Sequence, residues 1–298
     1  MSAMREKEQQ PALSVEDQII NLENLGLKID DKAIALSYLN NVSYFRMIKA
    51  FSLGLKGSDG KYKEGVSLSQ LIDLYEFNCD FRHLLFPVIE TVEVNMRCRV
   101  SNYFSVQYGV LGYEDVNNFA NPEYHEDFLC DLDEEIYRNR KSLFVKNFQQ
   151  NYSDGKIPMY AVVELFSFGM LSKFYKNMKP ADKKAIAKQY GLGYTYLESW
   201  LECAAYVRNI CAHYGRLYNT ILIKRPQIYA QYTNLGIDNS TIFGVLVCTK
   251  HLLMNNSQWI TFVSSLKELF EKYPVVDKTT MGFPDNWQDV LVVDLKEL

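Results

Sequence analysis

Apolar residues at helical spacing most constrain what this chain can fold into. Across residues 67–108 they recur every three or four positions, which is the pattern of an amphipathic helix. The positions that carry this pattern include Leu68, Leu71, Leu74, Val88, Val92, Met96 and Val100. Pro87 lies inside the stretch and should kink or divide the helix. Sustained strand alternation is missing from the sequence, and so is a glycine-rich phosphate loop, which argues against an NTPase or a dinucleotide enzyme.

Shorter helices are predicted on both sides of this stretch. On the N-terminal side a helix begins at Ser14 or Glu16 and is stopped by Gly26, and Asp30 and Asp31 cap a second helix. A third helix is expected over 42–55, followed at 58–61 by a turn signal that is typical of a small hairpin. The further helices are expected within 114–135, from Pro158 through Leu171, over 180–191, from Thr195 onward, and over 241–253 and 258–273.

These patterns predict an all-α protein, a helical bundle with an N-terminal helical extension. The predicted organisation is a disordered N-terminus over 1–12, an N-terminal helical region over 13–65 and a helical domain over 66–298.

The helix predicted from Thr195 carries the residues with the most chemistry. Its expected buried face comprises Leu197, Trp200, Leu201, Ala204, Val207 and Cys211. Thr195 and Glu198 form a capping-box pattern, and Gly215 is a candidate stop that would leave His213 near the helix end. Asn209 and His213 share a face of such a helix. Arg208 and His213 are separated by about 140° of rotation and roughly 7.5 Å of rise, which an arginine side chain can bridge.

Two interpretations of these residues compete. In the first, Arg208 pairs with an acid on a packed helix and His213 is a structural histidine. In the second, they form a metal-free ribonuclease site, in which His213 moves protons and Arg208 holds a phosphate. Elsewhere, Glu93 and Arg97 are four apart, which favours an intrahelical ion pair over a pair of catalytic carboxylates with Glu90.

Several segments resemble the Abi-like (abortive infection) bacterial family. The run Arg208-Asn209-Ile210-Cys211-Ala212-His213 fits the R-x4–6-H signature of HEPN-domain ribonucleases, and with Arg216-Leu217-Tyr218-Asn219 it is similar to the Abi-like signature. The other similar segments are Val42-Ser43-Tyr44-Phe45-Arg46, Glu164-Leu165-Phe166-Ser167-Phe168-Gly169 and Met281-Gly282-Phe283-Pro284-Asp285-Asn286-Trp287. The resemblance extends over about residues 13–291.

The resemblance implies a HEPN-like bundle and an endoribonuclease of abortive-infection or toxin type, with Arg208, Asn209 and His213 as catalytic residues. It also implies an RNA substrate, a homodimer with a composite active site, and no cofactor. The alternatives are a catalytically silent HEPN-like module that binds RNA or protein, and a helical partner of a nucleotidyltransferase.

Charge is unevenly distributed along the chain. Residues 1–135 carry 12 Lys and Arg against 23 Asp and Glu, a net of −11, whereas 136–298 carry 20 against 13, a net of +7. Residues 203–237 contain no acid. Within this run Arg216, Lys224 and Arg225 are candidate RNA-binding residues, since a basic field gathers phosphates, although a solvated face is an equal alternative.

Cysteine and histidine spacing points away from metal binding. The six cysteines form no C-x-x-C pair, and the four histidines are scattered, which argues against a zinc site. A reduced, cytoplasmic protein is expected. No apolar run approaches the length of a membrane span, and no signal region is expected at the N-terminus.

Overall fold

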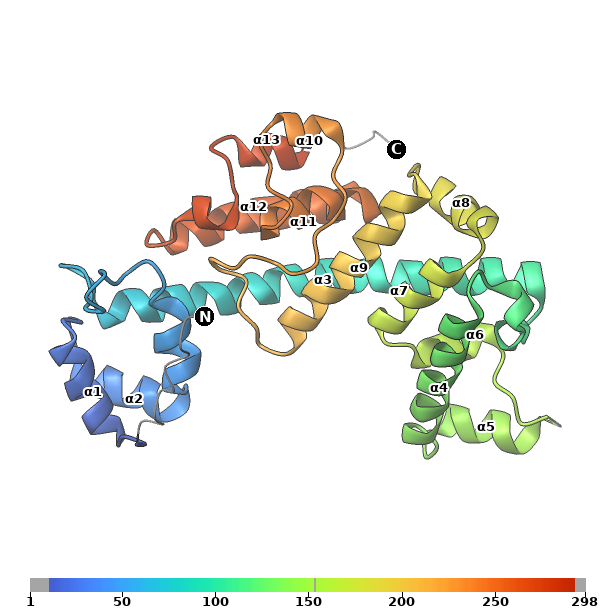
Figure 1. The fold of residues 1–298 in the computed structure, drawn as a ribbon, viewed down its shortest axis with the longest axis horizontal. Helices are drawn as coiled ribbons and strands as arrows, with labels where there is room; N and C mark the ends of the chain where they lie inside the picture. Colours follow the sequence, from blue (N-terminus) through green and yellow to red (C-terminus); the bar gives the residue numbers. More distant parts are fainter. Residues whose placement is uncertain (1–10, 153, 293–298) are drawn as a thin grey trace, which may run out of the picture. The chain divides into compact units, whose positions relative to one another are not determined.

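All regular secondary structure in the described part of the chain is helical. The computed structural model describes residues 11–152 and 154–292, and three isolated backbone bridges are its only β-type pairings (Figure 1). The prediction of an all-α protein is therefore confirmed. Most of the N-terminus that was expected to be disordered, residues 1–10, lies outside the described residues.

The chain divides into two compact units, residues 1–79 with 272–276, and residues 80–271 with 277–298. The domain limits expected at 13–65 and 66–298 stay a prediction. The first unit contains α1 (Val15–Asn24), α2 (Lys32–Asn41), a π-helix (Phe45–Lys49) and the first turns of α3 (Leu68–Tyr108).

Local side-chain caps explain where the first two helices begin. The Ser14 hydroxyl accepts a hydrogen bond from the Asp17 amide at 3.1 Å, and the Asp31 carboxylate accepts from the amide of Ala33 at 2.7 Å. Gly26, with φ of +86°, follows the end of α1, as predicted. The helix expected over 42–55 is shorter than predicted, because helical residues run only from Tyr44 to Phe51, around the five-residue π-helix, and turns follow.

The helix α3 is continuous from Leu68 to Tyr108, so Pro87 does not divide it (Figure 1). Proline removes one backbone donor from the helix interior. The apolar face nevertheless continues on both sides of Pro87, with Leu85, Val88, Ile89 and Val92 all at most 3% exposed. Burying an aliphatic side chain contributes about 1.5–3 kcal/mol, so several of them together offset the loss at the proline.

The second unit holds the remaining helices. They are α4 (Pro122–Arg138), α5 (Leu143–Asn151), α6 (Met159–Val162), α7 (Phe168–Asn177), α8 (Pro180–Lys188), α9 (Tyr194–Ala212), α10 (Ala230–Asn234), α11 (Ile242–Thr249), α12 (Asn256–Lys272) and α13 (Trp287–Val292). Short 3-10 turns lie at Gly112–Glu114, Val116–Asn118, Val163–Leu165, Lys250–Leu252 and Lys278–Met281. The helix α9 packs against α7, α8 and α11, and α7 packs also against α4.

The single helix predicted from Pro158 through Leu171 is instead two helices. The chain leaves helical geometry at Phe166, and Ser167 caps α7 by accepting a hydrogen bond from the Met170 amide at 3.1 Å. Glu164 lies in the intervening 3-10 turn and is exposed, and no ion pair of its carboxylate is found among the described residues.

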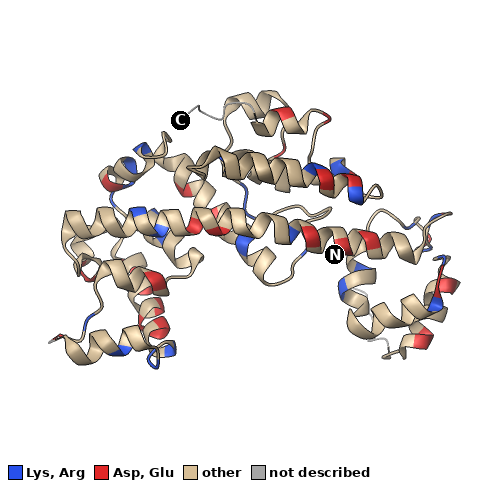
Figure 2. Ribbon diagram, turned by 180° about the vertical axis from the view of Figure 1, so that it is seen from behind, with Lys and Arg blue, Asp and Glu red and all other residues tan. Residues whose placement is uncertain are grey.

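Acidic residues are concentrated in α4, as Figure 2 shows. All six cysteines are free thiols, and burial raises the pKa of Cys203 and of Cys211 to about 12. No helix in the described part of the chain is both long and apolar enough to span a membrane.

Candidate active site

The helix α9 carries the predicted site residues and begins one residue earlier than expected. Its cap is Gly193, so the capping box predicted from Thr195 and Glu198 is wrong. Thr195 lies inside the helix and does not cap it. Glu198 faces α8 and forms an ion pair with Lys183 at 2.8 Å. The predicted buried face is confirmed, since all six of its residues are at most 7% exposed.

The helix ends at Ala212, which places His213 at its C-cap, as predicted. The Gly215 amide donates to the Ile210 carbonyl at 2.7 Å, and the Tyr214 amide donates to the Cys211 carbonyl at 3.4 Å. This pair of bonds is a Schellman ending. Its left-handed position is taken by Tyr214, with φ of 60°, rather than by a glycine. A residue with a side chain costs about 1–2 kcal/mol there, so the turn beside the motif is strained.

A glycine is required at position 215 because its backbone lies close to Ile210, and not because the position has a left-handed φ. A Cβ atom added to it would lie 2.7 Å from Ile210 Cγ2 and 3.1 Å from the Ile210 carbonyl oxygen. We expect Gly215→Ala to lower the free energy of unfolding by about 1–3 kcal/mol, as overpacking does. Urea denaturation measures this change.

Gly169→Ala in α7 is the matched control for this substitution. Its added Cβ would meet only Ser167 Oγ, at 3.7 Å, so a gain of about 0.5–1 kcal/mol is expected from the better helix former. Equal effects of the two substitutions would show that the approach of Gly215 to Ile210 is not constraining.

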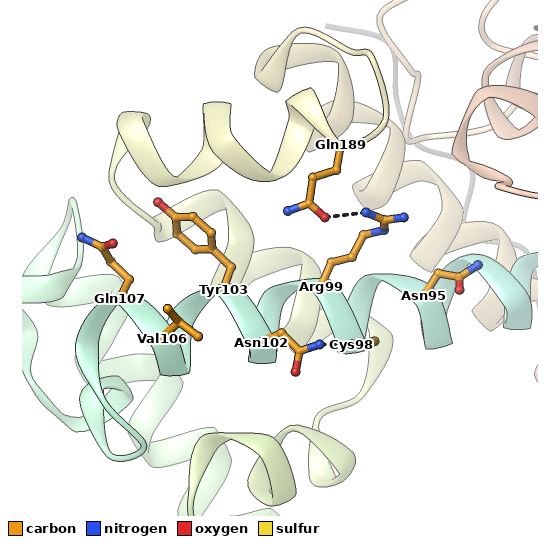
Figure 3. Close-up of a pocket in the computed structure, with 8 residues that line it drawn as sticks. All are labelled: Asn95, Cys98, Arg99, Asn102, Tyr103, Val106, Gln107 and Gln189. Carbon is orange, nitrogen blue, oxygen red and sulfur yellow. Dashed lines mark hydrogen bonds between the residues drawn. The ribbon is translucent and has the colours of Figure 1, made fainter. Parts of the chain in front are cut away.

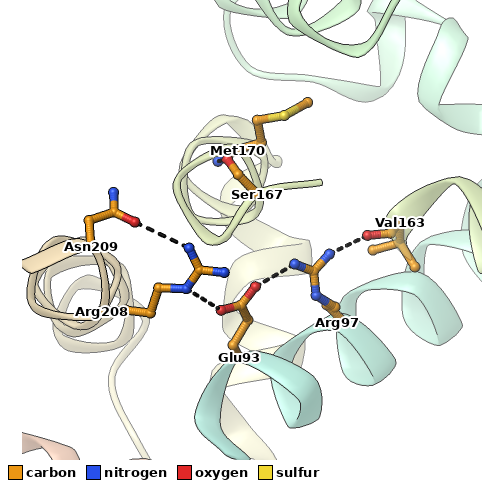
Figure 4. A network of polar contacts seen from close by, with 7 residues as sticks. All are labelled: Glu93, Arg97, Val163, Ser167, Met170, Arg208 and Asn209. Atoms are coloured by element: carbon orange, nitrogen blue, oxygen red, sulfur yellow. Dashed lines mark hydrogen bonds and ion pairs between the residues drawn. The ribbon is translucent and has the colours of Figure 1, made fainter. Parts of the chain in front are cut away.

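Arg208 lies in a chain of ion pairs that joins α9 to α3 (Figure 4). Its Nε forms an ion pair with Glu93 Oε2 at 3.3 Å, and its Nη1 donates a hydrogen bond to Asn209 Oδ1 at 3.4 Å. The other oxygen of Glu93 accepts from Arg97, which also donates to the Val163 carbonyl. One carboxylate thus serves two guanidinium groups.

The network is largely buried at Glu93 and open at Arg208. The side chains of Glu93 and Arg97 are 8% and 11% exposed, whereas that of Arg208 is 30% exposed. No hydrogen bond of the Arg208 Nη2 is found among the described residues. Arg208 therefore pairs with an acid, as the first interpretation expected, and retains N–H donors that an anion can reach.

Sequence reasoning identified the Glu93–Arg97 pair but missed the pairing of Glu93 with Arg208. The two residues are far apart in the chain, and only the packing of α9 beside α3 brings them together. It also missed Arg82, which is 5% exposed and donates to the Gly215 carbonyl at 2.8 Å. Arg82 thereby holds the turn that follows His213.

His213 is exposed, and no hydrogen bond or ion pair of its imidazole is found among the described residues. The structure brings Arg208 and Asn209 together but forms no such bond between Arg208 and His213. Two other histidines are held structurally: His125 Nε2 lies 2.8 Å from the Tyr113 carbonyl, and the His251 ring bonds the Tyr232 hydroxyl. His213 is thus open to solvent, as a proton carrier for an external substrate must be.

Each candidate RNA-binding residue has a hydrogen-bond partner, an ion-pair partner or an acidic neighbour in the structure. Lys224 forms an ion pair with Glu202. Arg216 donates to Thr220 Oγ1 at 3.2 Å, and burial lowers the pKa of its guanidinium from the ordinary value. Hydrogen bonds of Ser240 lower the pKa of the Asp238 carboxyl, and the positive charge of Arg225 lowers it further. Arg225 itself is exposed. The basic field read from the sequence is therefore partly neutralised in space.

A cavity of about 470 Å³ adjoins the motif and is lined by residues of α4, α7 and α9, with Asn209 among them. Arg208 and His213 do not line it. A second cavity, of about 520 Å³, lies along α3 and contains none of the predicted site residues (Figure 3). There Arg99 donates to Gln189 and lies 4.7 Å from the Tyr190 ring centre. Among the described residues, no three His, Cys, Asp or Glu side chains gather to hold a metal ion.

Comparison with known protein families gives a match. The family model described as Abi-like protein matches residues 37–219, which include the motif and end directly after it. The C-terminal resemblance at 281–287 lies outside the matched range and stays a prediction. No curated protein and no solved structure matches the chain.

Proposed function

This chain belongs to the Abi-like protein family, and we propose that it is a metal-independent endoribonuclease acting in abortive infection. One observation carries the proposal. Glu93 holds the Nε of Arg208 at 3.3 Å, the Nη2 remains available to an anion, and an exposed histidine follows five residues later on the same helix. A guanidinium held by a carboxylate and an exposed imidazole five residues further along the chain suit a phosphodiester substrate.

In the proposed reaction the RNA 2′-hydroxyl attacks its own phosphodiester. The bond between O2′ and phosphorus forms, the bond between phosphorus and O5′ breaks, one base takes the 2′-hydroxyl proton and one acid protonates O5′. Arg208 stabilises the charge on the phosphorane, and Asn209 orients the arginine through its Oδ1. His213 carries one of the two protons, and a second copy of the site supplies the other carrier.

The alternative function is a catalytically silent module that binds RNA or a protein. The ion pair between Arg208 and Glu93 favours it, because that contact already gives the charge of the arginine a partner without any substrate. Cleavage of labelled RNA by the purified full chain separates the two functions.

We expect cleavage to persist in excess EDTA and to leave a 2′,3′-cyclic phosphate opposite a 5′-hydroxyl. The substrate's own 2′-hydroxyl is already adjacent to the phosphate, so it needs no metal to position it. DNA, which lacks this hydroxyl, should be spared. The assay tests the 3′ ends for resistance to ligation and phosphatase until acid opens the ring. Activity that disappears in EDTA and returns with magnesium would contradict the mechanism.

We also expect a homodimer in which the two Arg208–His213 segments face each other, since each copy carries one motif. Light scattering at the concentrations used for cleavage should give twice the chain mass. Mixing Arg208→Ala with His213→Ala chains tests which residues each half-site uses, because the mixed dimer keeps one Arg208 and one His213 and should show defined, partial activity or none. A monomer with full activity would rule out the composite site.

A further inference from the structure

The cavity beside Asn209 is formed along α7, between α4 and α9. Its floor is the aromatic cluster of Phe119, Phe128 and Phe174, whose rings lie 5.1 to 6.4 Å apart. Its walls carry two more accessible rings, Tyr124 of α4, which is 55% exposed, and Tyr206 of α9. A cavity of 470 Å³ with aromatic walls has the size and lining of a small-ligand site.

Polar groups surround this aromatic lining. Lys224 and Lys173 are paired with Glu202 and Asp131. Three further polar groups of the rim carry no such partner among the described residues: the ammonium of Lys176, the carboxylate of Asp127 and the Nδ2 of Asn209. The cavity thus offers both hydrogen-bond donors and an acceptor around an apolar base.

Asn209 connects this cavity to the candidate phosphate site. Its side chain lines the cavity and its Oδ1 also accepts from Arg208 at 3.4 Å. A ligand that reached both places would therefore have a planar apolar part in the cavity and a phosphate at the guanidinium, as a nucleotide does.

We propose that this cavity binds one unstacked nucleobase of a single-stranded RNA, next to the phosphate held by Arg208. This inference takes RNA as the substrate from the proposed function, and it adds that one nucleobase of the RNA is recognised in the cavity. Unpaired bases stack on aromatic side chains and are read along their polar edges. Asp127 accepts hydrogen bonds only, so we expect it to favour bases that present an exocyclic amino group over uracil, whose one base donor is its N3–H.

The test uses the full chain carrying His213→Ala, so that binding is measured without cleavage. The probes are fluorescein-labelled oligouridylates and the same oligomers with one central A, C or G. We expect the substituted oligomers to bind more tightly than oligouridylate, and Asp127→Asn to remove that difference. Replacing a stacking residue by Tyr206→Leu should weaken binding roughly tenfold, in line with the contribution of one stacked base. Tyr160→Leu, at a tyrosine of α6 that is 54% exposed, is the matched control.

A second variant blocks the cavity without removing any contact. Gly169 lines it at the start of α7, and its position tolerates a Cβ. Gly169→Leu should abolish tight RNA binding while Gly169→Ala keeps it, with thermal unfolding measured for both. If folded Gly169→Leu or Tyr206→Leu binds RNA with the affinity of the parent chain, the proposal is overturned. A protein segment is then the remaining ligand for the cavity.

These outcomes are distinct from failure of the proposed function. RNA binding that depends on the cavity in a chain that never cleaves RNA would support the base site and reject the ribonuclease. Cleavage by Gly169→Leu with the KM and base preference of the unmodified chain would support the ribonuclease and reject the base site.

Discussion

Replacing Arg208 or His213 by alanine should each reduce RNA cleavage by about 10²–10⁴-fold, the usual contribution of a positioned proton carrier or of a charge aimed at the transition state. His213 is exposed at the C-cap of α9, so its removal should leave the free energy of unfolding nearly unchanged. Arg208→Ala leaves Glu93 paired with Arg97, so the protein should still fold. Single-turnover cleavage of labelled RNA at equal folded concentration measures both effects.

Two controls separate chemistry from structure in this experiment. Arg208→Lys keeps a positive charge for Glu93 but loses the guanidinium fork, so it should fold normally and remain inactive. His83→Ala removes another exposed histidine, on α3, and should leave cleavage unchanged. Cleavage at the unmodified rate by either Arg208→Ala or His213→Ala would show that the residue is not part of the active site.

Glu93→Ala should give the largest loss of stability, about 3–5 kcal/mol, because it leaves two guanidinium groups facing each other without their shared carboxylate. The side chain of Glu93 is only 8% exposed, so water cannot easily replace it. Cleavage should fall as well, since Arg208 loses the contact that fixes its Nε. Urea denaturation gives the free energy, and circular dichroism reports whether the helices remain.

Glu90→Ala is the matched control, because Glu90 lies one turn earlier on α3 and is exposed. Its substitution should change the free energy of unfolding by no more than about 0.5 kcal/mol. If the two alanine variants are equally stable, the ion pairs of Glu93 contribute nothing measurable, and the position of Arg208 must depend on packing alone.

Features set by neighbouring residues were predictable from the sequence. Asp31 caps α2 through an amide two residues away, and the apolar face of α9 follows from the spacing of Leu197, Leu201 and Ala204. Both depend on interactions within one or two turns of helix, which the order of residues specifies directly. The same holds for the placement of His213 at a helix end.

The contacts between side chains of different helices were decided only by the tertiary structure. Glu93 meets Arg208, and Arg82 meets the carbonyl of Gly215, because residues 80–108 of α3 and the end of α9 belong to the same compact unit. A periodic pattern shows that a face is buried but does not name the helix that covers it. The pairing of buried charges therefore follows from packing, since each charge must find a partner among the side chains that the fold brings within reach.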